Sequence, residues 1–126
     1  MSKEERLHEK KIINELFEKG RTFHLSPFKV VWMSVEFKSK YPAKILISVS
    51  KRNFKKATDR NYIKRLMREA FRKNKSIIYE ALKELNKKIA FILNYSSNTI
   101  IPYSEIESKI ILILQRLAKE NEKNNE

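Results

Sequence analysis

The net positive charge of this 126-residue chain is concentrated between Lys51 and Lys75. This basic segment holds eleven Lys or Arg residues against two acids, so it contributes +9 of the formal +13. From residue 57 to about residue 73, apolar and basic side chains recur with helical spacing, because residues three and four apart lie on one side of a helix. The apolar side must be buried and the charged side must stay outside. The segment therefore predicts a surface helix that packs on a core through one face.

The exposed side of this helix is positive along its length. We call it the basic face, and it consists of Arg60, Asn61, Lys64, Arg65, Arg68 and Arg72. Solvated helix faces usually mix both signs, whereas like charges four residues apart destabilise an isolated helix. An anionic partner would offset that repulsion. Lys51, Arg52 and Lys56 add charge before the helix, and a nucleic acid fits best because each neutralised phosphate releases counterions and adds affinity.

Periodicity in the rest of the chain predicts a single α+β domain over residues 1–119. Helical spacing favours a first helix from Ser2 to about Lys19, ended by Gly20, and a last helix from a capping box at Ser104–Glu107 to about Lys119. Runs of β-branched and aromatic residues predict strands over 28–37, 44–50 and 87–94, the first two joined as a hairpin, and a short extra strand over 23–25. The expected order is α-β-β-(β)-α-β-α, and the polar tail 120–126 is expected to be disordered.

Composition excludes several classes of site. The chain has no cysteine, which rules out disulfides and thiolate chemistry, and its single glycine, Gly20, rules out a glycine-rich phosphate loop. Its longest apolar run, Ile110–Leu114, is far shorter than the roughly 20 residues of a membrane helix, and the N-terminus lacks an apolar signal-peptide region. We therefore expect a cytoplasmic protein with no membrane partner.

The reactive side chains argue against catalysis by the protein itself. His8 and His24 are the only histidines, and nothing in the sequence brings them together or gives either a carboxylate partner. No His, Asp or Glu spacing matches a metal site, so we expect no catalytic residue and no metal ligand. A protein-only nuclease that uses the two histidines is an alternative that requires cleavage without RNA. A helix-turn-helix DNA binder fits less well, because strands flank the basic helix.

The order of residues in and before the basic helix resembles the protein subunit of bacterial ribonuclease P. The similar residues run Ser48-Val49-Ser50-Lys51-Arg52 and then Ala57-x-x-Arg60-Asn61-x-Ile63-Lys64-Arg65-Leu66-x-Arg68-Glu69-x-Phe71-Arg72. Arg6-Leu7, Phe17, Gly20 and Phe28 extend the resemblance, which covers about residues 5–118. The chain departs from the family pattern in four places: Tyr62 stands for an arginine, Ile13 for a phenylalanine, Asn94-Tyr95 for basic residues and Leu46 for a glycine.

The resemblance implies an α/β sandwich in which the basic helix forms a left-handed crossover between parallel strands. It also implies that a catalytic RNA subunit, bound one to one, holds magnesium and removes the 5′ leader from precursor tRNA. The protein would then bind no cofactor alone and need no obligate protein partner. It would raise the affinity of the RNA enzyme for substrate and magnesium. Another basic RNA-binding module, such as a ribosome-associated protein, is the alternative.

The functional residues of the family carry over onto this chain in two groups. Contacts with the catalytic RNA are implied for the basic face and the residues before it: Lys51, Arg52, Lys56, Arg60, Asn61, Lys64, Arg65, Arg68 and Arg72. A cleft between the first helix and the sheet is implied for the 5′ leader. Phe17, Phe28 and Trp32 are the aromatic side chains on which its unpaired bases could stack.

Overall fold

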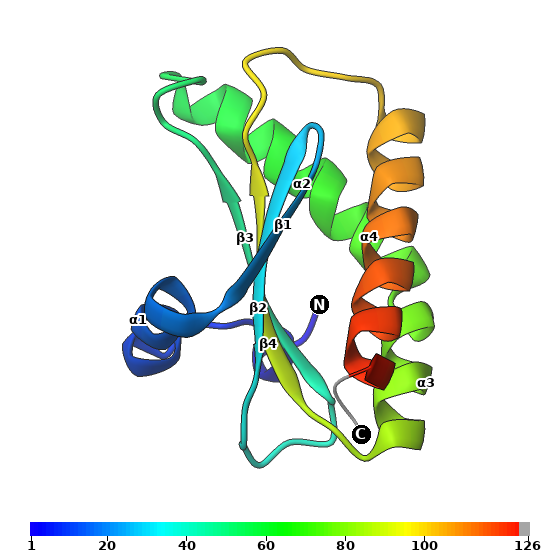
Figure 1. The fold of residues 1–126 in the computed structure, drawn as a ribbon. Coiled ribbons are helices and arrows are strands. Elements are labelled where there is room, and N and C mark those ends of the chain that lie inside the picture. The colour runs from blue at the N-terminus through cyan, green and yellow to red at the C-terminus, as the bar shows by residue number, and fades with distance from the viewer. Residues whose placement is uncertain (124–126) are drawn as a thin grey trace.

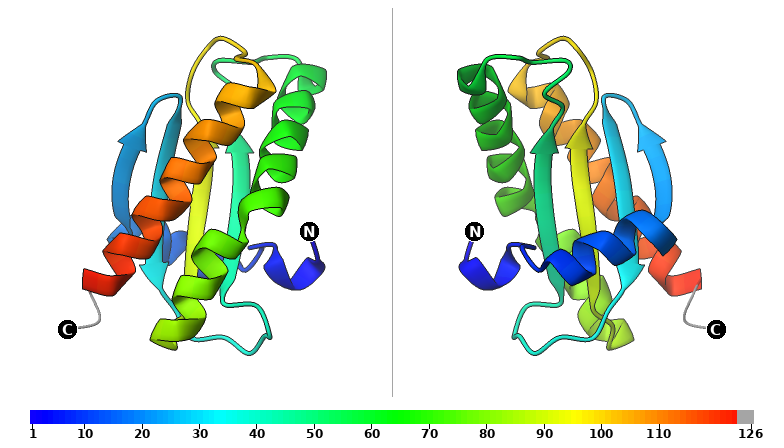
Figure 2. Two further views of the ribbon diagram at one scale, coloured as in Figure 1. Left: turned by 90° about the vertical axis from the view of Figure 1, so that its right-hand side faces the viewer. Right: turned by 90° about the vertical axis from the view of Figure 1, so that its left-hand side faces the viewer.

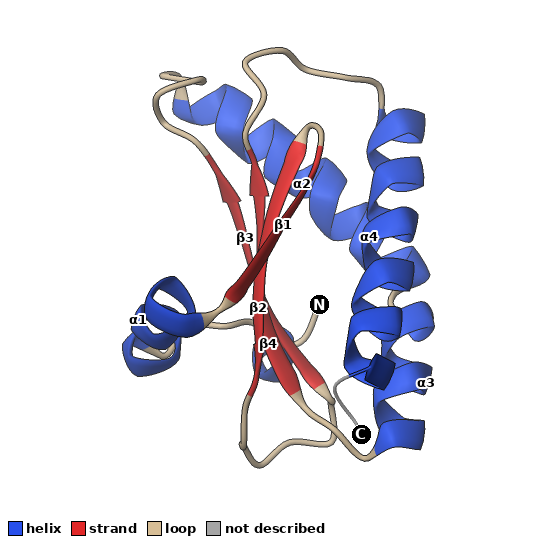
Figure 3. Ribbon diagram, in the orientation of Figure 1, coloured by secondary structure: helices blue, strands red, loops and turns tan. Residues whose placement is uncertain are grey.

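The computed structural model describes residues 1–123, in which a four-stranded sheet separates one α-helix from three others (Figure 1; Figure 3). In chain order the elements are the 3₁₀ helix η1 (Lys3–Glu5), α1 (Lys10–Lys19), β1 (Arg21–Leu25), β2 (Phe28–Ser34), β3 (Ala43–Val49), α2 (Ala57–Asn74), α3 (Ser76–Leu85), β4 (Ile89–Tyr95) and α4 (Tyr103–Lys123). Helices α2, α3 and α4 lie on one face of the sheet, and α1 crosses part of the other (Figure 2). The α+β fold class predicted from the sequence is confirmed.

Strand β4 occupies the middle of the sheet. The strand order is β1-β2-β4-β3, and β4 runs antiparallel to β2 and parallel to β3. Six of its seven residues are buried, as expected for a strand covered on both faces. The expected hairpin between the strands at 28–37 and 44–50 is therefore wrong, because β4 inserts between β2 and β3. Instead, β2 forms its hairpin with β1, which confirms the short extra strand.

The connection from β3 to β4 passes through α2 and α3 and is a left-handed crossover. In the left view of Figure 2 these helices lie in front of the sheet, β3 and β4 both point upward, and β4 lies to the left of β3. A right-handed connection, the usual form, would place the second strand on the right. The crossover implied by the family resemblance is thus present, and it lays the basic helix, α2, against β3 and α4.

Alternation along the strands sends side chains into two separate cores. On β2, Phe28, Val30 and Trp32 belong to the larger core beneath α2, α3 and α4. Val31 and Met33 belong to a smaller cluster with residues of α1. This division matches the two-residue period of a strand, and it decides which side chains are available on each face of the sheet.

The expected first helix is interrupted between η1 and α1. Leu7 donates its backbone N–H to the Ile45 carbonyl over 2.9 Å, and Arg6 pairs with Ile45 along the edge of β3. Just before this bridge, the buried Glu5 carboxylate accepts hydrogen bonds from Lys75, over 2.8 Å, and from the Tyr79 hydroxyl. These long-range bonds hold the segment extended, and a continuous helix would break them.

Helix α3 was not predicted from the sequence. Its Ile78 and Leu82 are completely buried in the larger core. It ends at Leu85, and the next residue, Asn86, has a φ of 54° in the left-handed region, a conformation that asparagine tolerates better than most residues. The basic helix and α3 therefore follow one another with only Lys75 between them.

Helix α4 is longer than predicted at both ends. It begins at Tyr103, one residue before the expected capping box, and continues to Lys123. The expected disorder is wrong for residues 120–123, because Asn121 is buried and its carbonyl accepts a 2.8 Å hydrogen bond from Lys87 Nζ. The rest of the predicted tail, 124–126, lies outside the described residues. Within residues 1–123, no helix combines the length and the apolar composition needed to cross a membrane.

We predict that Glu5→Gln destabilises the protein at neutral pH by about 1–3 kcal/mol, because Lys75 would be deprived of its buried counter-charge. Burial alone would raise the pKa of Glu5, but hydrogen bonds from Lys75, Tyr79 and the Ser2 N–H outweigh burial and hold it below its ordinary 4.5. A depressed pKa adds stability that is present above 4.5 and is lost as the pH falls through the folded-state value. Urea unfolding of both proteins should show their free energies converging in acid.

The exposed neighbour Glu4 provides the control for this prediction. Glu4→Gln should leave the free energy of unfolding within about 0.5 kcal/mol of the wild type. Equal destabilisation by Glu4→Gln and Glu5→Gln would contradict a specific role for the buried carboxylate.

Candidate RNA interface

Helix α2 holds its apolar face in the core and its basic face in solvent. Ile63, Met67 and Ala70 are completely buried. On the opposite side, Asn61, Arg65, Arg68 and Arg72 are exposed, and Arg60 and Lys64 are half-buried. The two faces predicted from helical spacing are confirmed. Because α2 packs on β3 and α4 through the buried side, the basic face points away from the rest of the protein.

The loop that precedes α2 is held in place by three side chains. Phe54 is buried with its ring 6.1 Å from that of Tyr95, and Asn53 Nδ2 donates to the Ser96 carbonyl over 2.8 Å. Arg60 Nη1 donates to the carbonyls of Phe54 and Lys55 over 2.7 and 2.8 Å. Arg60 therefore positions the loop through Nη1. Within residues 1–123, the other N–H groups of its guanidinium make no such bond to the loop and can face a partner. That loop presents the exposed side chains of Lys51, Arg52, Lys55 and Lys56 beside the start of the helix.

The charges along α2 are not equally available. Arg72 Nη2 lies 2.6 Å from a carboxylate oxygen of Glu69, and this hydrogen bond lowers the pKa of Glu69. Within residues 1–123, no carboxylate forms an ion pair with Lys64, Arg65 or Arg68. The positive charge open to a partner is therefore greatest in the first three turns of α2 and decreases toward Arg72.

Two of the three aromatic side chains predicted to meet the 5′ leader are not available to it. Phe28 and Trp32 are only 1 % and 2 % exposed and belong to the larger core, on the face of the sheet opposite α1. The expectation for these two residues is wrong, because the face that α1 crosses receives Lys29, Val31 and Met33 instead. Phe17 differs: it lies on α1 and is 70 % exposed.

The α1 side of the sheet carries a row of polar side chains. One residue from each strand contributes to this row, and neighbours are paired in register, so all four lie on one face. In sheet order the residues are His24, Lys29, Asn94 and Ser48. Ser48 Oγ donates to Asn94 Oδ1 over 2.8 Å. This row was not predicted from the sequence, because it can be recognised only once β4 is known to lie between β2 and β3.

Helix α1 crosses the same face of the sheet, as the right view of Figure 2 shows. The polar row lies away from α1, near the ends of β3 and β4, where Ser48 pairs with Asn94. Helix α1 sits over Val31, Ala90 and Ile92 through Leu16. At 100° per residue, Phe17 and Ile13 lie on the side of α1 away from Ile12 and Glu15. Since Ile12 and Glu15 border a groove beyond the helix, Phe17 lies on the side of α1 next to the uncovered polar row.

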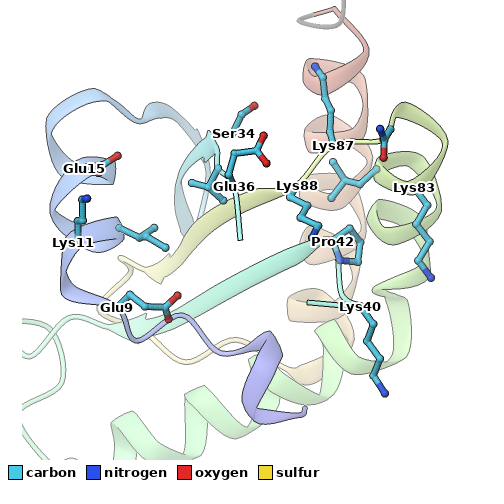
Figure 4. A pocket seen from close by; sticks show the side chains of 14 residues that line it. Glu9, Lys11, Glu15, Ser34, Glu36, Lys40, Pro42, Lys83, Lys87 and Lys88 are labelled. Carbon is cyan, nitrogen blue, oxygen red and sulfur yellow. The ribbon is translucent and has the colours of Figure 1, made fainter. Parts of the chain in front are cut away.

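The groove beyond α1 has a volume of about 1100 Å³ and lies between α1, the β2–β3 loop and the α3–β4 turn (Figure 4). Two of the lysines that line it already donate hydrogen bonds within the protein: Lys88 Nζ to the Phe37 carbonyl and Lys87 Nζ to the Asn121 carbonyl. Glu9, Glu15 and Glu36 also line it. With both signs of charge along its walls, this groove is a poor match for a polyanion.

The two histidines lie in different parts of the fold. Across residues 1–123, no group of three or more His, Cys, Asp or Glu side chains could hold a metal ion. His8 contacts Glu9 and the Arg6 carbonyl before α1, whereas His24 lies on β1 opposite Lys29. The positive helix face and the polar sheet face both offer groups that suit the binding of a polyanion.

Comparison with known proteins gives a consistent result. The sequence model of the family described as Ribonuclease P matches residues 1–118. The ribonuclease P protein component of Porphyromonas gingivalis (strain ATCC 33277) is 38 % identical over 96 residues, which cover 74 % of this chain and 69 % of that protein. The corresponding component of Chlorobium phaeobacteroides is 34 % identical over 87 residues, covering 67 % and 60 %.

Solved structures show the same fold. The ribonuclease P protein from Thermotoga maritima superposes with a TM-score of 0.70 at 23 % identity, covering 89 % of this chain and 96 % of that one. The ribonuclease P protein of Staphylococcus aureus superposes with a TM-score of 0.65 at 25 % identity, covering 90 % and 94 %.

Proposed function

Because the chain belongs to the ribonuclease P protein family, we propose that it docks on the catalytic RNA of that enzyme through the basic face of α2. Family membership makes the chain a protein subunit of the endoribonuclease that processes the 5′ end of tRNA, and it functions with the ribonuclease P RNA. The alternative of a ribosome-associated RNA-binding module is not favoured by these relatives.

One observation carries the docking proposal: Lys64, Arg65 and Arg68 stand on one side of a rigid helix with no internal counter-charge among the described residues. Packing of Ile63, Met67 and Ala70 fixes the rotation of that helix, so the side of the protein on which these charges stand is set before the RNA arrives. A helix that is already folded loses little backbone freedom on binding. The loop before α2 adds three more positive side chains beside the helix: Lys51, Arg52 and Lys56.

For the 5′ leader we propose the uncovered half of the sheet on the α1 side. Phe17 offers a ring for stacking, Lys29 offers a charge for a phosphate, and Asn94 and Ser48 offer hydrogen bonds to a base edge or ribose hydroxyl. These groups suit a single strand, whose bases are unpaired and can be turned toward the protein. Of the three aromatic residues predicted to meet the leader, Phe17 is the one exposed enough to do so.

We further propose that one protein binds one catalytic RNA and that magnesium is held by the RNA rather than by the protein. The catalytic RNA and the precursor tRNA are both polyanions and repel each other. Positive charge on the protein reduces this repulsion, which magnesium and other cations otherwise have to screen. Adding this protein to its cognate RNA should therefore lower the magnesium concentration needed to remove the leader from precursor tRNA. Cleavage rates measured across a magnesium titration at moderate salt would test this, and an unchanged requirement would refute it.

Arg65→Ala and Arg68→Ala should each weaken binding to the catalytic RNA and flatten its dependence on salt. The slope of log affinity against log salt should fall by about 0.7–0.9 for each phosphate that the variant no longer neutralises. Filter binding at several salt concentrations measures both quantities. Lys119→Ala, which removes an exposed charge from α4, should leave the slope unchanged. If the salt slope is the same in the arginine variants as in the wild type, Arg65 and Arg68 do not contact phosphates and are ordinary solvated charges.

Phe17→Ala should weaken binding of precursor tRNA to the assembled enzyme by about 5- to 150-fold, the effect of removing one base-stacking ring. Affinity for mature tRNA, which has no leader, should not change, and Phe17→Tyr should bind like the wild type because it keeps a ring. Equal weakening for precursor and mature tRNA would rule out a leader contact at this position.

A further inference from the structure

Tyr62 is an aromatic side chain that the fold leaves in solvent at the border of the basic face. It is 44 % exposed, although its neighbour Ile63 is completely buried. Taking 100° per residue, Tyr62 lies 60° around the helix from Arg65, on the border between the basic face and the half-buried Leu66. Packing in the core therefore does not account for a ring at this position.

The ring is paired with a cation of the basic face. The guanidinium carbon of Arg65 lies 5.4 Å from the centroid of the Tyr62 ring, within the range of a cation–π contact. The two planar groups are one helical turn apart, and both remain exposed. Together they form a planar, partly apolar surface within a field of positive charge.

From this arrangement we infer that Tyr62 and Arg65 form a stacking site for an unpaired nucleobase of the catalytic RNA. Every base has a π face that stacks on an aromatic ring or a guanidinium plane. A base inside a duplex has both faces covered by its neighbours, so the ligand must be a bulged or looped nucleotide. Lys64 and Arg68, on the same exposed side, would attract the phosphates on either side of it.

The catalytic RNA is favoured over the 5′ leader because of where α2 lies. Helix α2 is on the face of the sheet opposite α1 (Figure 2), whereas Phe17 and the polar row of the leader proposal lie on the α1 side. A single-stranded leader bound beside Phe17 would have to pass around the edge of the β-sheet to reach Tyr62. The inference rests on the proposed docking of α2 and adds the kind of nucleotide that the helix binds.

Stacking and charge pairing can be separated by their dependence on salt. A stacked base releases no counterions, so Tyr62→Leu should weaken binding to the isolated catalytic RNA by about 5- to 150-fold with the salt slope unchanged. Leucine is of similar size and favours helix, and circular dichroism checks that the fold is kept. Tyr62→Phe retains the ring and should bind like the wild type.

Each other outcome would overturn the inference. A flatter slope in Tyr62→Leu would mean that the ring only positions Arg65 on a phosphate, and equal weakening in Tyr62→Phe and Tyr62→Leu would assign the contact to the hydroxyl. A defect confined to binding of precursor tRNA would place the ring on the leader. Arg68→Ala, measured in parallel, separates the two proposals: if it weakens binding while Tyr62→Leu does not, only the stacking site fails.

Discussion

The burial of β4 on both faces is the constraint on which the rest of this structure depends. A strand with six of seven residues buried needs a neighbour on each side and a layer of helix on each face. Since β4 comes late in the chain and runs parallel to β3, the connection between them has to cross a face of the sheet. The basic helix is the first part of that connection, so the path of the chain lays it against the sheet, on the face opposite α1.

Local spacing predicted the elements whose faces are defined within one segment. The two faces of α2, for example, follow from the spacing of residues three and four apart. Phe28 and Trp32 were placed beside the leader because of the family resemblance, and spacing alone could not show that α1 crosses the other face of the sheet. The interruption before α1 depends on bonds from Glu5 to Lys75 and Tyr79, which no local pattern encodes.

The fold separates two kinds of recognition. On the helical face, α2 presents mainly charge, which supplies affinity without selecting among RNA sequences, and Tyr62 beside Arg65 adds one surface for stacking. On the α1 face, hydrogen-bonding groups and the exposed Phe17 ring suit unpaired nucleotides. The sheet lies between the two surfaces, so each can contact a different polyanion at the same time.

The bridge between Arg6 and Ile45 also covers part of an open sheet edge. Strand β3 lies at the end of the sheet order, and an outer strand with open N–H and C=O groups invites another chain to add a strand there. The N-terminal segment occupies this position at Ile45, and the buried carboxylate of Glu5 secures it from within. The same few residues that shorten the first helix thus leave less of the β3 edge open to a strand from another chain.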